Sequence, residues 1–393
     1  MKNSTIIFRA TNSWNLECKY CYDKKNHISM NEENKEFELK IPKIIEYISE
    51  LWSDKNLKSE IIFHGGEPLV INADNYDVLM GKIKEMYPKA KFSIQTNATL
   101  INEKNIKILK KYNVNIGISL DGFNEQTNCY RVYKNGKNSF ENVMKKIELL
   151  KENDINFGII MTLTNSVKGR EKEFYEFIGK NNLKCNIRPA FECGQKGNEY
   201  MKNEDYYDFF KNLFNIWIQD KQETVKLTQI KELYDEFICA LQPNYRIKSC
   251  STSGNCFKNF ISLDRMGNLY SCNRVYQNKE FFYGNIEEID MEELEEKINN
   301  EIRERNKYIK SSKCKSCKIY NNCRGGCPAN AYSIYGTTES IDDSFCVAKV
   351  KIKEYINEYL DKNKIREEYE EMKKDVEKLY KWWKFNYTNC LWK

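Results

Sequence analysis

The stretch Trp14-Asn15-Leu16-Glu17-Cys18-Lys19-Tyr20-Cys21-Tyr22 decides the fold. It follows an apolar run, Thr5-Ile6-Ile7-Phe8, which predicts a buried strand. Two cysteines with two residues between them, in the loop that leaves a first strand, can bind two irons of an iron–sulfur cluster. The stretch therefore predicts a metal-binding loop at the end of the first strand.

The composition is that of a globular protein without a membrane span. The chain has 393 residues, of which 41% are hydrophobic and 31% charged, and no apolar run is long enough to cross a bilayer. The net charge of +6, from 63 basic and 57 acidic residues, gives little support for nucleic-acid binding. The N-terminus has no signal-peptide pattern, so we expect a cytoplasmic protein. In that compartment, 15 cysteines favour metal binding over disulfides.

Strand-like and helix-like segments alternate over the first 220 residues. This order predicts an α/β fold with a parallel sheet, although periodicity does not show whether the sheet closes into a barrel. The predicted strands are 5–9, 60–63, 92–95, 114–120, 157–163 and 185–188. The predicted helices are 40–52, 76–86, 102–112, 140–151, 171–181 and 204–218.

Polar and glycine residues follow the predicted strands where the strands end. His64-Gly65-Gly66-Glu67-Pro68 follows the second strand, Asn97 the third and Ser119 the fourth, and Arg131 comes shortly afterwards. Paired glycines allow backbone N–H groups to approach a ligand, and a glutamate can pair with an ammonium group. Each residue could equally be a cap, a turn or one half of a surface ion pair. Their common position at strand ends favours a ligand site.

Eight cysteines lie beyond residue 249, which is enough for two sites of four thiolates each. Four-cysteine sites hold either 4Fe–4S clusters or zinc, and spacing alone leaves both open. A charged helix, predicted at 291–306, separates the two groups of cysteines. They are Cys250, Cys256, Cys272, Cys314, Cys317, Cys323, Cys327 and Cys346.

Cys18, Cys21 and Tyr22 resemble the Cys-x3-Cys-x2-Cys-aromatic loop of radical SAM enzymes. The Gly-Gly-Glu-Pro segment after the second strand strengthens this resemblance. It implies a partial (β/α)6 TIM-like barrel that binds a 4Fe–4S cluster and S-adenosylmethionine at the carboxyl ends of its strands. The residues that the resemblance assigns to S-adenosylmethionine are Tyr20, Gly65, Gly66, Glu67, Asn97, Ser119 and Arg131.

The later cysteines resemble a SPASM domain, which carries two auxiliary 4Fe–4S clusters. The resemblance implies that Cys250, Cys256, Cys272 and Cys327 bind cluster I, and that Cys314, Cys317, Cys323 and Cys346 bind cluster II. Given the barrel that precedes them, iron–sulfur is favoured over zinc. The predicted division is a barrel at 1–220, a helical bridge at 221–249, a SPASM domain at 250–350 and a helical tail at 351–393, whose Trp382–Phe385 segment is apolar.

Trp14 stands where the family pattern has its first cysteine. An indole N–H is a hydrogen-bond donor only, so it cannot bind iron. Three explanations for the tryptophan compete. The chain is a variant of an active enzyme, it is a natural pseudoenzyme, or another residue such as Cys129 replaces the missing ligand. We favour the variant, because the other residues of the pattern and both auxiliary cysteine sets are complete.

SPASM relatives mostly modify peptide or protein side chains. We therefore predict a maturase that forms thioether or carbon–carbon crosslinks in a ribosomal peptide and is inactive with Trp14. One alternative is a pseudoenzyme that binds a peptide or partner, and a second is a sulfatase-maturating, formylglycine-generating enzyme. The sulfatase branch carries an aspartate after the third cluster I cysteine, where this chain has Asn273. An electron donor such as flavodoxin or ferredoxin and a separate leader-peptide-binding protein are further expected partners.

Overall fold

The computed structural model describes residues 5–23, 30–52, 59–190, 197–220, 222, 224–242, 245–247, 249–254 and 256–373. The predicted apolar segment Trp382–Phe385 lies outside these residues. Two compact units make up the chain. The first contains residues 1–120, 124–157 and 255–308, and the second contains residues 121–123, 158–254 and 309–393.

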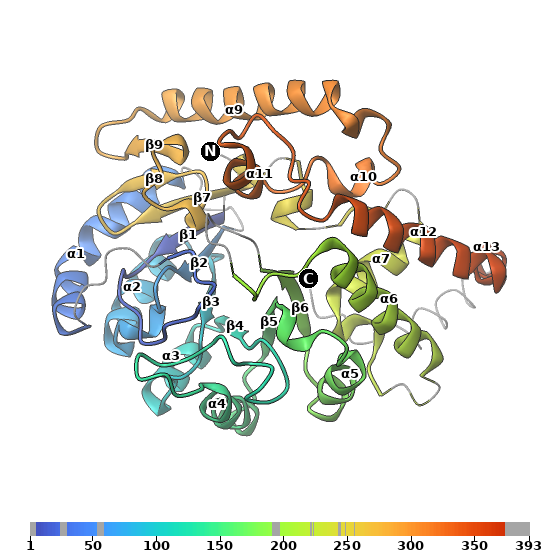
Figure 1. Ribbon diagram of the computed structural model, residues 1–393. Coiled ribbons are helices and arrows are strands. Elements are labelled where there is room, and N and C mark those ends of the chain that lie inside the picture. Colours follow the sequence, from blue (N-terminus) through green and yellow to red (C-terminus); the bar gives the residue numbers. More distant parts are fainter. Residues whose placement is uncertain are drawn as a thin grey trace. The chain divides into compact units, whose positions relative to one another are not determined.

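Four parallel strands form the centre of the first unit (Figure 1). They are β1 (Thr5–Arg9), β2 (Glu60–His64), β3 (Lys91–Thr96) and β4 (Asn115–Ser119). The strand order within this unit is β4-β3-β2-β1-β7-β8-β9. The connecting helices are α1 (Met30–Leu51), α2 (Ala73–Met86) and α3 (Glu103–Lys111), and α4 (Phe140–Glu152) follows β4. The parallel α/β class predicted from the sequence is confirmed.

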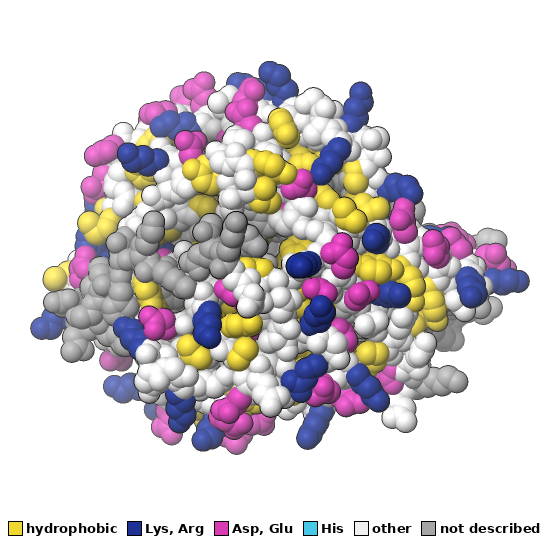
Figure 2. All heavy atoms as spheres, in the orientation of Figure 1, with side chains coloured by type: hydrophobic (Ala, Val, Ile, Leu, Met, Phe, Trp, Pro, Cys, Tyr) yellow, Lys and Arg dark blue, Asp and Glu magenta, His cyan; other side chains and the backbone are white. Residues whose placement is uncertain are grey.

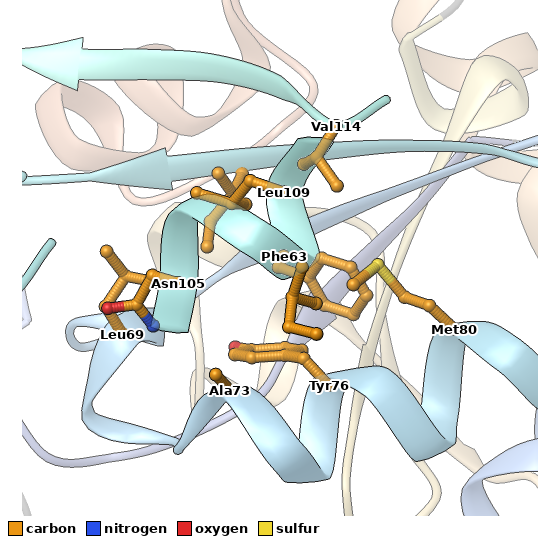
Figure 3. A pocket seen from close by; sticks show the side chains of 10 residues that line it. Phe63, Leu69, Ala73, Tyr76, Met80, Asn105, Leu109 and Val114 are labelled. Atoms are coloured by element: carbon orange, nitrogen blue, oxygen red, sulfur yellow. The ribbon is translucent and has the colours of Figure 1, made fainter. Parts of the chain in front are cut away.

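The core of the first unit lies between the strands and these helices. Phe63 on β2 meets Tyr76 on α2 with ring centroids 4.9 Å apart, and Leu109 on α3 lies beside them (Figure 3). The void among these side chains is about 10 Å³, roughly the space of one water molecule. Tight packing of this kind fixes the strands, and hence the loops at their ends, in one arrangement.

Helix α1 begins ten residues earlier than predicted, at Met30 rather than Lys40. Proline has no backbone N–H and is usually excluded from helix interiors. In the structure Pro42 lies inside the helix on its exposed face. Phe37, Ile41 and Ile44 are buried on the opposite face and hold the helix against the core.

Three strands that the sequence analysis did not predict extend this sheet. β7 (Phe260–Asp264) runs parallel to β1, and the antiparallel strands β8 (Asn268–Tyr270) and β9 (Phe282–Asn285) follow it. Ile261 pairs with Ile6, and Leu263 pairs with Phe8. The region of the later cysteines therefore contributes strands to the sheet that contains β1, the strand before the first cysteine loop. Helix α8 (Cys256–Asn259) precedes β7, and α9 (Met291–Ser311) follows β9.

The second unit contains the parallel pair β5 (Phe157–Leu163) and β6 (Cys185–Pro189), with α5 (Glu171–Lys180) between them. Helices α6 (Asn203–Gln219) and α7 (Lys231–Leu241) precede α10 (Tyr320–Cys323), α11 (Pro328–Tyr335), α12 (Cys346–Lys362) and α13 (Ile365–Lys373). Helix α12 packs on α6, where Tyr206 stacks on Phe345 at 4.5 Å and Phe214 meets Tyr359 at 5.4 Å. The helical character predicted for the tail is thus observed as far as Lys373.

Basic and acidic side chains are interspersed on the face that Figure 2 shows. This matches the near balance of 63 basic and 57 acidic residues in the sequence. Among the described residues, no helix combines the length and the apolar character that a membrane span requires.

Candidate cofactor site and cysteine clusters

The candidate site lies at the carboxyl ends of β1 to β4 in the first unit. Parallel strands place their carboxyl ends at one edge of a sheet, where ligand sites of α/β folds are usually found. The loops at this edge carry residues 10–23, 65–72 and 97–102. They contain most of the residues that the sequence assigned to S-adenosylmethionine, together with Cys18 and Cys21.

Gly65 and Gly66 bring the loop after β2 into backbone contact with the loop after β1. Both have positive φ, +80° and +49°. A Cβ atom on Gly66 would lie 2.3 Å from the carbonyl oxygen of Ser13, and one on Gly65 would lie 2.3 Å from the Cγ of Arg9. The Glu67 N–H donates to the Ser13 carbonyl at 2.8 Å. Only glycine allows this approach without strain.

Gly66→Ala is expected to lower the free energy of unfolding by about 1–3 kcal/mol, because it adds a backbone clash to an unfavourable φ. It is also expected to weaken binding of S-adenosylmethionine by at least about tenfold, or 1.4 kcal/mol. Urea denaturation and calorimetric titration measure the two effects. Gly136→Ala is the control, since Gly136 also has a positive φ, +80°, but nothing lies within 4 Å of the added Cβ. Equal effects from both variants would contradict the role given to the close approach.

Glu67 is buried and holds the loop after β3. Its Oε1 accepts from Thr96 Oγ1 at 2.6 Å and from Leu69 N at 3.0 Å, and its Oε2 accepts from Asn97 N at 2.8 Å. Burial raises the pKa of this carboxyl group, although the three hydrogen bonds and nearby Arg131 oppose the shift. A carboxylate has about four acceptor positions, so an ammonium group would be a fourth partner.

The residues on either side of Trp14 are both anchored to neighbouring loops. The carbonyl of Ser13 accepts from Glu67, as described above. Asn15 accepts from Asn97 Nδ2 at 2.9 Å and donates to Thr99 Oγ1 at 2.8 Å. The backbone at position 14 is therefore fixed by its neighbours, and the half-buried indole projects from this fixed position.

The two cysteines of the loop lie against the segment that contains Arg131. Lys19 N donates to the Tyr130 carbonyl at 3.0 Å, which joins the two segments. Arg131 Nη1 lies 3.8 Å from Cys18 Sγ, and its guanidinium lies 5.5 Å from the centre of the Tyr20 ring. A cation beside a thiol stabilises the thiolate, which is the form that binds metal. Cys21 Sγ accepts from a backbone amide, that of residue 23, at 3.4 Å.

Ser119 and Cys129 occupy different surroundings. Ser119 ends β4, and its Oγ accepts from Gln95 Nε2 on β3 at 2.9 Å. Cys129 is half-buried in the turn before Arg131. Its role as a replacement iron ligand stays a prediction.

Arg9 and Asp23 connect three parts of this edge, and the sequence analysis missed both. Arg9 is 2% exposed, and its Nη2 pairs with Asp23 Oδ2 at 2.5 Å. The same carboxylate oxygen accepts from Gly66 N at 3.4 Å. The Arg9 guanidinium also stacks on Tyr276 at 4.0 Å and reaches Asn273 Oδ1 at 3.5 Å. A buried charge requires such partners. The sequence signal that could have identified Arg9 is its position as a charged residue at the end of a buried strand.

Asn273 lies beside His64. The Asn273 Nδ2 is 3.2 Å from His64 Nδ1, which also accepts from Gly65 N at 2.8 Å. Burial and the charge of Arg9 lower the pKa of His64 to about 4, so the imidazole is neutral at neutral pH. The neutral amide of Asn273 and the neutral imidazole of His64 therefore lie side by side at this edge of the sheet.

A cavity of about 230 Å³ adjoins Arg9. Its lining includes two buried ionic groups besides Arg9, and each already has protein partners. Arg265 pairs with Glu33 and Glu36, and Asp264 Oδ2 accepts from Tyr276 at 3.1 Å. The cavity lining is therefore polar with its charges internally balanced. Its residues are Arg9, Thr11, Asn12, Glu36, Asp264, Arg265, Met266 and Tyr276.

All four cysteines assigned to cluster II belong to the second unit. The Cys317 N–H donates to the Cys314 carbonyl at 3.1 Å, which gives the tight turn expected for a Cys-x2-Cys ligand pair. The pKa of Cys346 is raised to about 12, mainly by burial and to a smaller extent by Cys323. Burial also raises the pKa of Cys323, with contributions from Asp342 and Cys314. Four thiol donors suit a 4Fe–4S cluster, and the assignment of these four residues to cluster II stays a prediction.

The cysteines assigned to cluster I are divided between the units. Cys256 begins α8 and Cys272 follows β8 in the first unit, whereas Cys250 and Cys327 belong to the second. In the described parts of the chain, no three His, Cys, Asp or Glu side chains converge as the ligands of one metal ion do. The assignment of these four residues to one cluster stays a prediction.

Comparison with known protein families gives one match, to the radical SAM superfamily, over residues 14–178. The chain contains a radical SAM domain. The match begins at Trp14 and includes the loops that carry Cys18, the paired glycines and Arg131. The radical SAM domain predicted from the sequence is therefore confirmed over these residues, and Arg9 and Asn273 lie outside the matched range.

Similar proteins include a sulfatase-maturating enzyme and a cyclopropyl synthase. The chain is 28% identical over 341 residues to the cysteine-type anaerobic sulfatase-maturating enzyme of Clostridium perfringens strain 13, covering 82% of this chain and 88% of that enzyme. It is 26% identical over 355 residues to the radical SAM cyclopropyl synthase TigE of Paramaledivibacter caminithermalis, covering 86% of this chain and 70% of TigE.

The fold resembles a solved structure, native anSMEcpe with bound AdoMet. The TM-score is 0.74 at 25% sequence identity, and the match covers 91% of this chain and 98% of that one. Iron–sulfur clusters and S-adenosylmethionine, the cofactors predicted from the sequence, agree with the radical SAM domain and with this relative.

Proposed function

We propose that the chain is a radical SAM maturase that modifies a side chain of a peptide or protein by thioether or carbon–carbon crosslinking. The observation that carries the proposal is the backbone contact between the first cysteine loop and the Gly65-Gly66 turn, which builds a cradle at one sheet edge inside a radical SAM domain. When bound, S-adenosylmethionine and a reduced cluster supply a 5′-deoxyadenosyl radical that removes a hydrogen atom from the substrate.

The residues of the chain bind and orient the cofactor in this proposal. The open backbone at Gly65 and Gly66 receives the methionyl group, and Glu67 accepts its ammonium as a fourth partner. Arg131 stabilises the Cys18 thiolate and covers Tyr20, which lies where the adenine is expected. Asn97 and Ser119 border the same edge and complete the binding surface.

The residues at the first cysteine loop do not fit a complete radical SAM cluster. Cys18 and Cys21 supply two thiolates, whereas three irons need ligands, and the fixed backbone at position 14 presents an indole. We therefore propose that the chain with Trp14 has little radical activity, and that it is a variant of an active maturase. A pseudoenzyme that holds a peptide or partner is the alternative with the same fold.

Sulfatase maturation is a second candidate, because the chain is similar over 82% of its length to a sulfatase-maturating enzyme. Asn273 weighs against it. Its amide lies between Arg9 and His64, and an amide cannot accept the proton that the aspartate at this position of the sulfatase branch is proposed to take.

Product analysis with the Trp14→Cys chain tests these functions. Under anaerobic conditions with a flavodoxin or ferredoxin donor, the chain is given a cysteine-rich precursor peptide, with and without a separate leader-peptide-binding protein, or a sulfatase-derived cysteine peptide. A crosslink removes two hydrogen atoms from the peptide, whereas formylglycine formation replaces the thiol group and one Cβ hydrogen of the cysteine by an aldehyde oxygen. We expect the crosslink, and formylglycine as the sole product would contradict it. Unmodified peptides despite 5′-deoxyadenosine formation would contradict both functions.

A further inference from the structure

A lysine and an aspartate lie beside the cysteines assigned to cluster II, and the proposed function uses neither. Lys349 follows Cys346 by three residues in α12. Residues three apart in a helix lie on the same side, about 5–6 Å apart at Cβ. Lys349 is half-buried.

The surroundings of Lys349 favour its charged form. Burial opposes the charge, but Tyr206 and Asp342 outweigh it, and the pKa of Lys349 lies above its usual value.

Asp342 is fixed between the segments that carry Cys327 and Cys346. It is 5% exposed, and its Oδ2 accepts from Cys327 N at 3.2 Å and from Asn330 Nδ2 at 2.9 Å. Its Oδ1 accepts from Ser344 Oγ at 2.7 Å, and its carbonyl accepts from Cys346 Sγ at 3.6 Å. A Cβ on Gly326 would lie 2.6 Å from the Cβ of Asp342, so the glycine permits this close packing.

We propose that Lys349 raises the reduction potential of the iron–sulfur cluster held by Cys314, Cys317, Cys323 and Cys346, and that Asp342 lowers it. Reduction adds one electron, and therefore one negative charge, to a cluster that already carries four thiolates. A nearby cation stabilises the reduced form and a nearby anion destabilises it, more strongly in a partly buried site than in water. The inference rests on the proposed assignment of these four cysteines as cluster ligands.

Other charges near these cysteines are more exposed. Lys313 pairs with Asp343 at 3.0 Å, and its side chain is 61% exposed, so its effect is screened by water. Lys351 is exposed on the same helix as Lys349. Lys351→Met therefore makes the same change of charge in the same helix, outside the cysteine environment, and serves as the matched control.

An EPR-monitored reductive titration of the anaerobically reconstituted full chain tests the proposal. At a fixed potential, Lys349→Met is expected to lower the reduced-to-oxidised ratio of cluster II about tenfold, which is 59 mV for a one-electron couple. Lys349→Arg and Lys351→Met are expected to change this ratio by less than about twofold, which corresponds to a potential shift of about a quarter to a third of 59 mV. Asp342→Asn is expected to raise the ratio, which tests the charge effect even if Lys349→Met does not fold.

An unchanged ratio in both Lys349→Met and Asp342→Asn, with cluster II present by iron analysis, would overturn the inference and leave the proposed function standing. Equal shifts in Lys349→Met and Lys351→Met would also overturn it. Absence of iron from these four cysteines in the unmodified chain would overturn the cluster assignment, and the inference with it.

Discussion

Trp14→Cys is expected to raise bound iron from about eight to about twelve atoms per chain, because a third thiolate completes a further 4Fe–4S site. Ser13 and Asn15 hold the backbone at position 14 through Glu67, Asn97 and Thr99, so the new thiol starts from the same anchored position as the indole. Cleavage of S-adenosylmethionine should appear with the added iron. Iron analysis and quantification of 5′-deoxyadenosine after anaerobic reconstitution measure both effects.

Trp14→Ala is the control for this experiment. It removes the bulk of the indole without adding a ligand, so iron should stay near eight atoms per chain. Substantial 5′-deoxyadenosine from the unmodified chain would show that Trp14 does not block the site. Trp14→Cys with no added iron and no cleavage would favour the pseudoenzyme over a variant of an active maturase.

Cys346→Ala is expected to reduce bound iron from about eight to about four atoms per chain, because it removes one of four thiolates from cluster II. Cys346 begins α12, which packs on α6 through the stacked rings of Tyr206 and Phe345. Loss of the cluster should therefore also loosen the second unit. Iron analysis and limited proteolysis measure the two consequences.

Cys239→Ala provides the comparison for Cys346→Ala. Cys239 is buried on α7, where burial raises the pKa of its thiol to about 12, and the sequence assigns it to no cluster. We expect its replacement to leave the iron content unchanged. If both cysteine variants lost the same amount of iron, the loss would reflect general instability and would contradict the assignment of Cys346 as a ligand.

The strands of the α/β region could be read from the sequence because each is a short apolar run. Thr5–Arg9 and Phe157–Leu163 were predicted with the observed bounds. The glycine turn was likewise visible, since positive φ values at Gly65 and Gly66 require that residue type. Local chemistry was sufficient in both cases.

Long-range contacts could not be read in the same way. The pairing of β7 with β1 joins residues about 250 positions apart, and nothing in either strand specifies its partner. Arg9 could have been noticed as a charge at the end of a buried strand, but Asp23 looks like an ordinary surface charge in the sequence, and only the fold shows that the two form an ion pair. Glu67 was predicted as a ligand for ammonium, but its hydrogen bonds to the loop after β3 depend on strand order.

The central claim is that the chain as written holds two auxiliary iron–sulfur clusters and lacks a complete radical SAM cluster. Mössbauer spectroscopy of the anaerobically reconstituted chain, combined with iron and zinc analysis, tests it most directly. We predict about eight irons per chain in 4Fe–4S clusters and no zinc. Zinc in place of iron, or no iron–sulfur signal in oxygen-free material, would contradict the account.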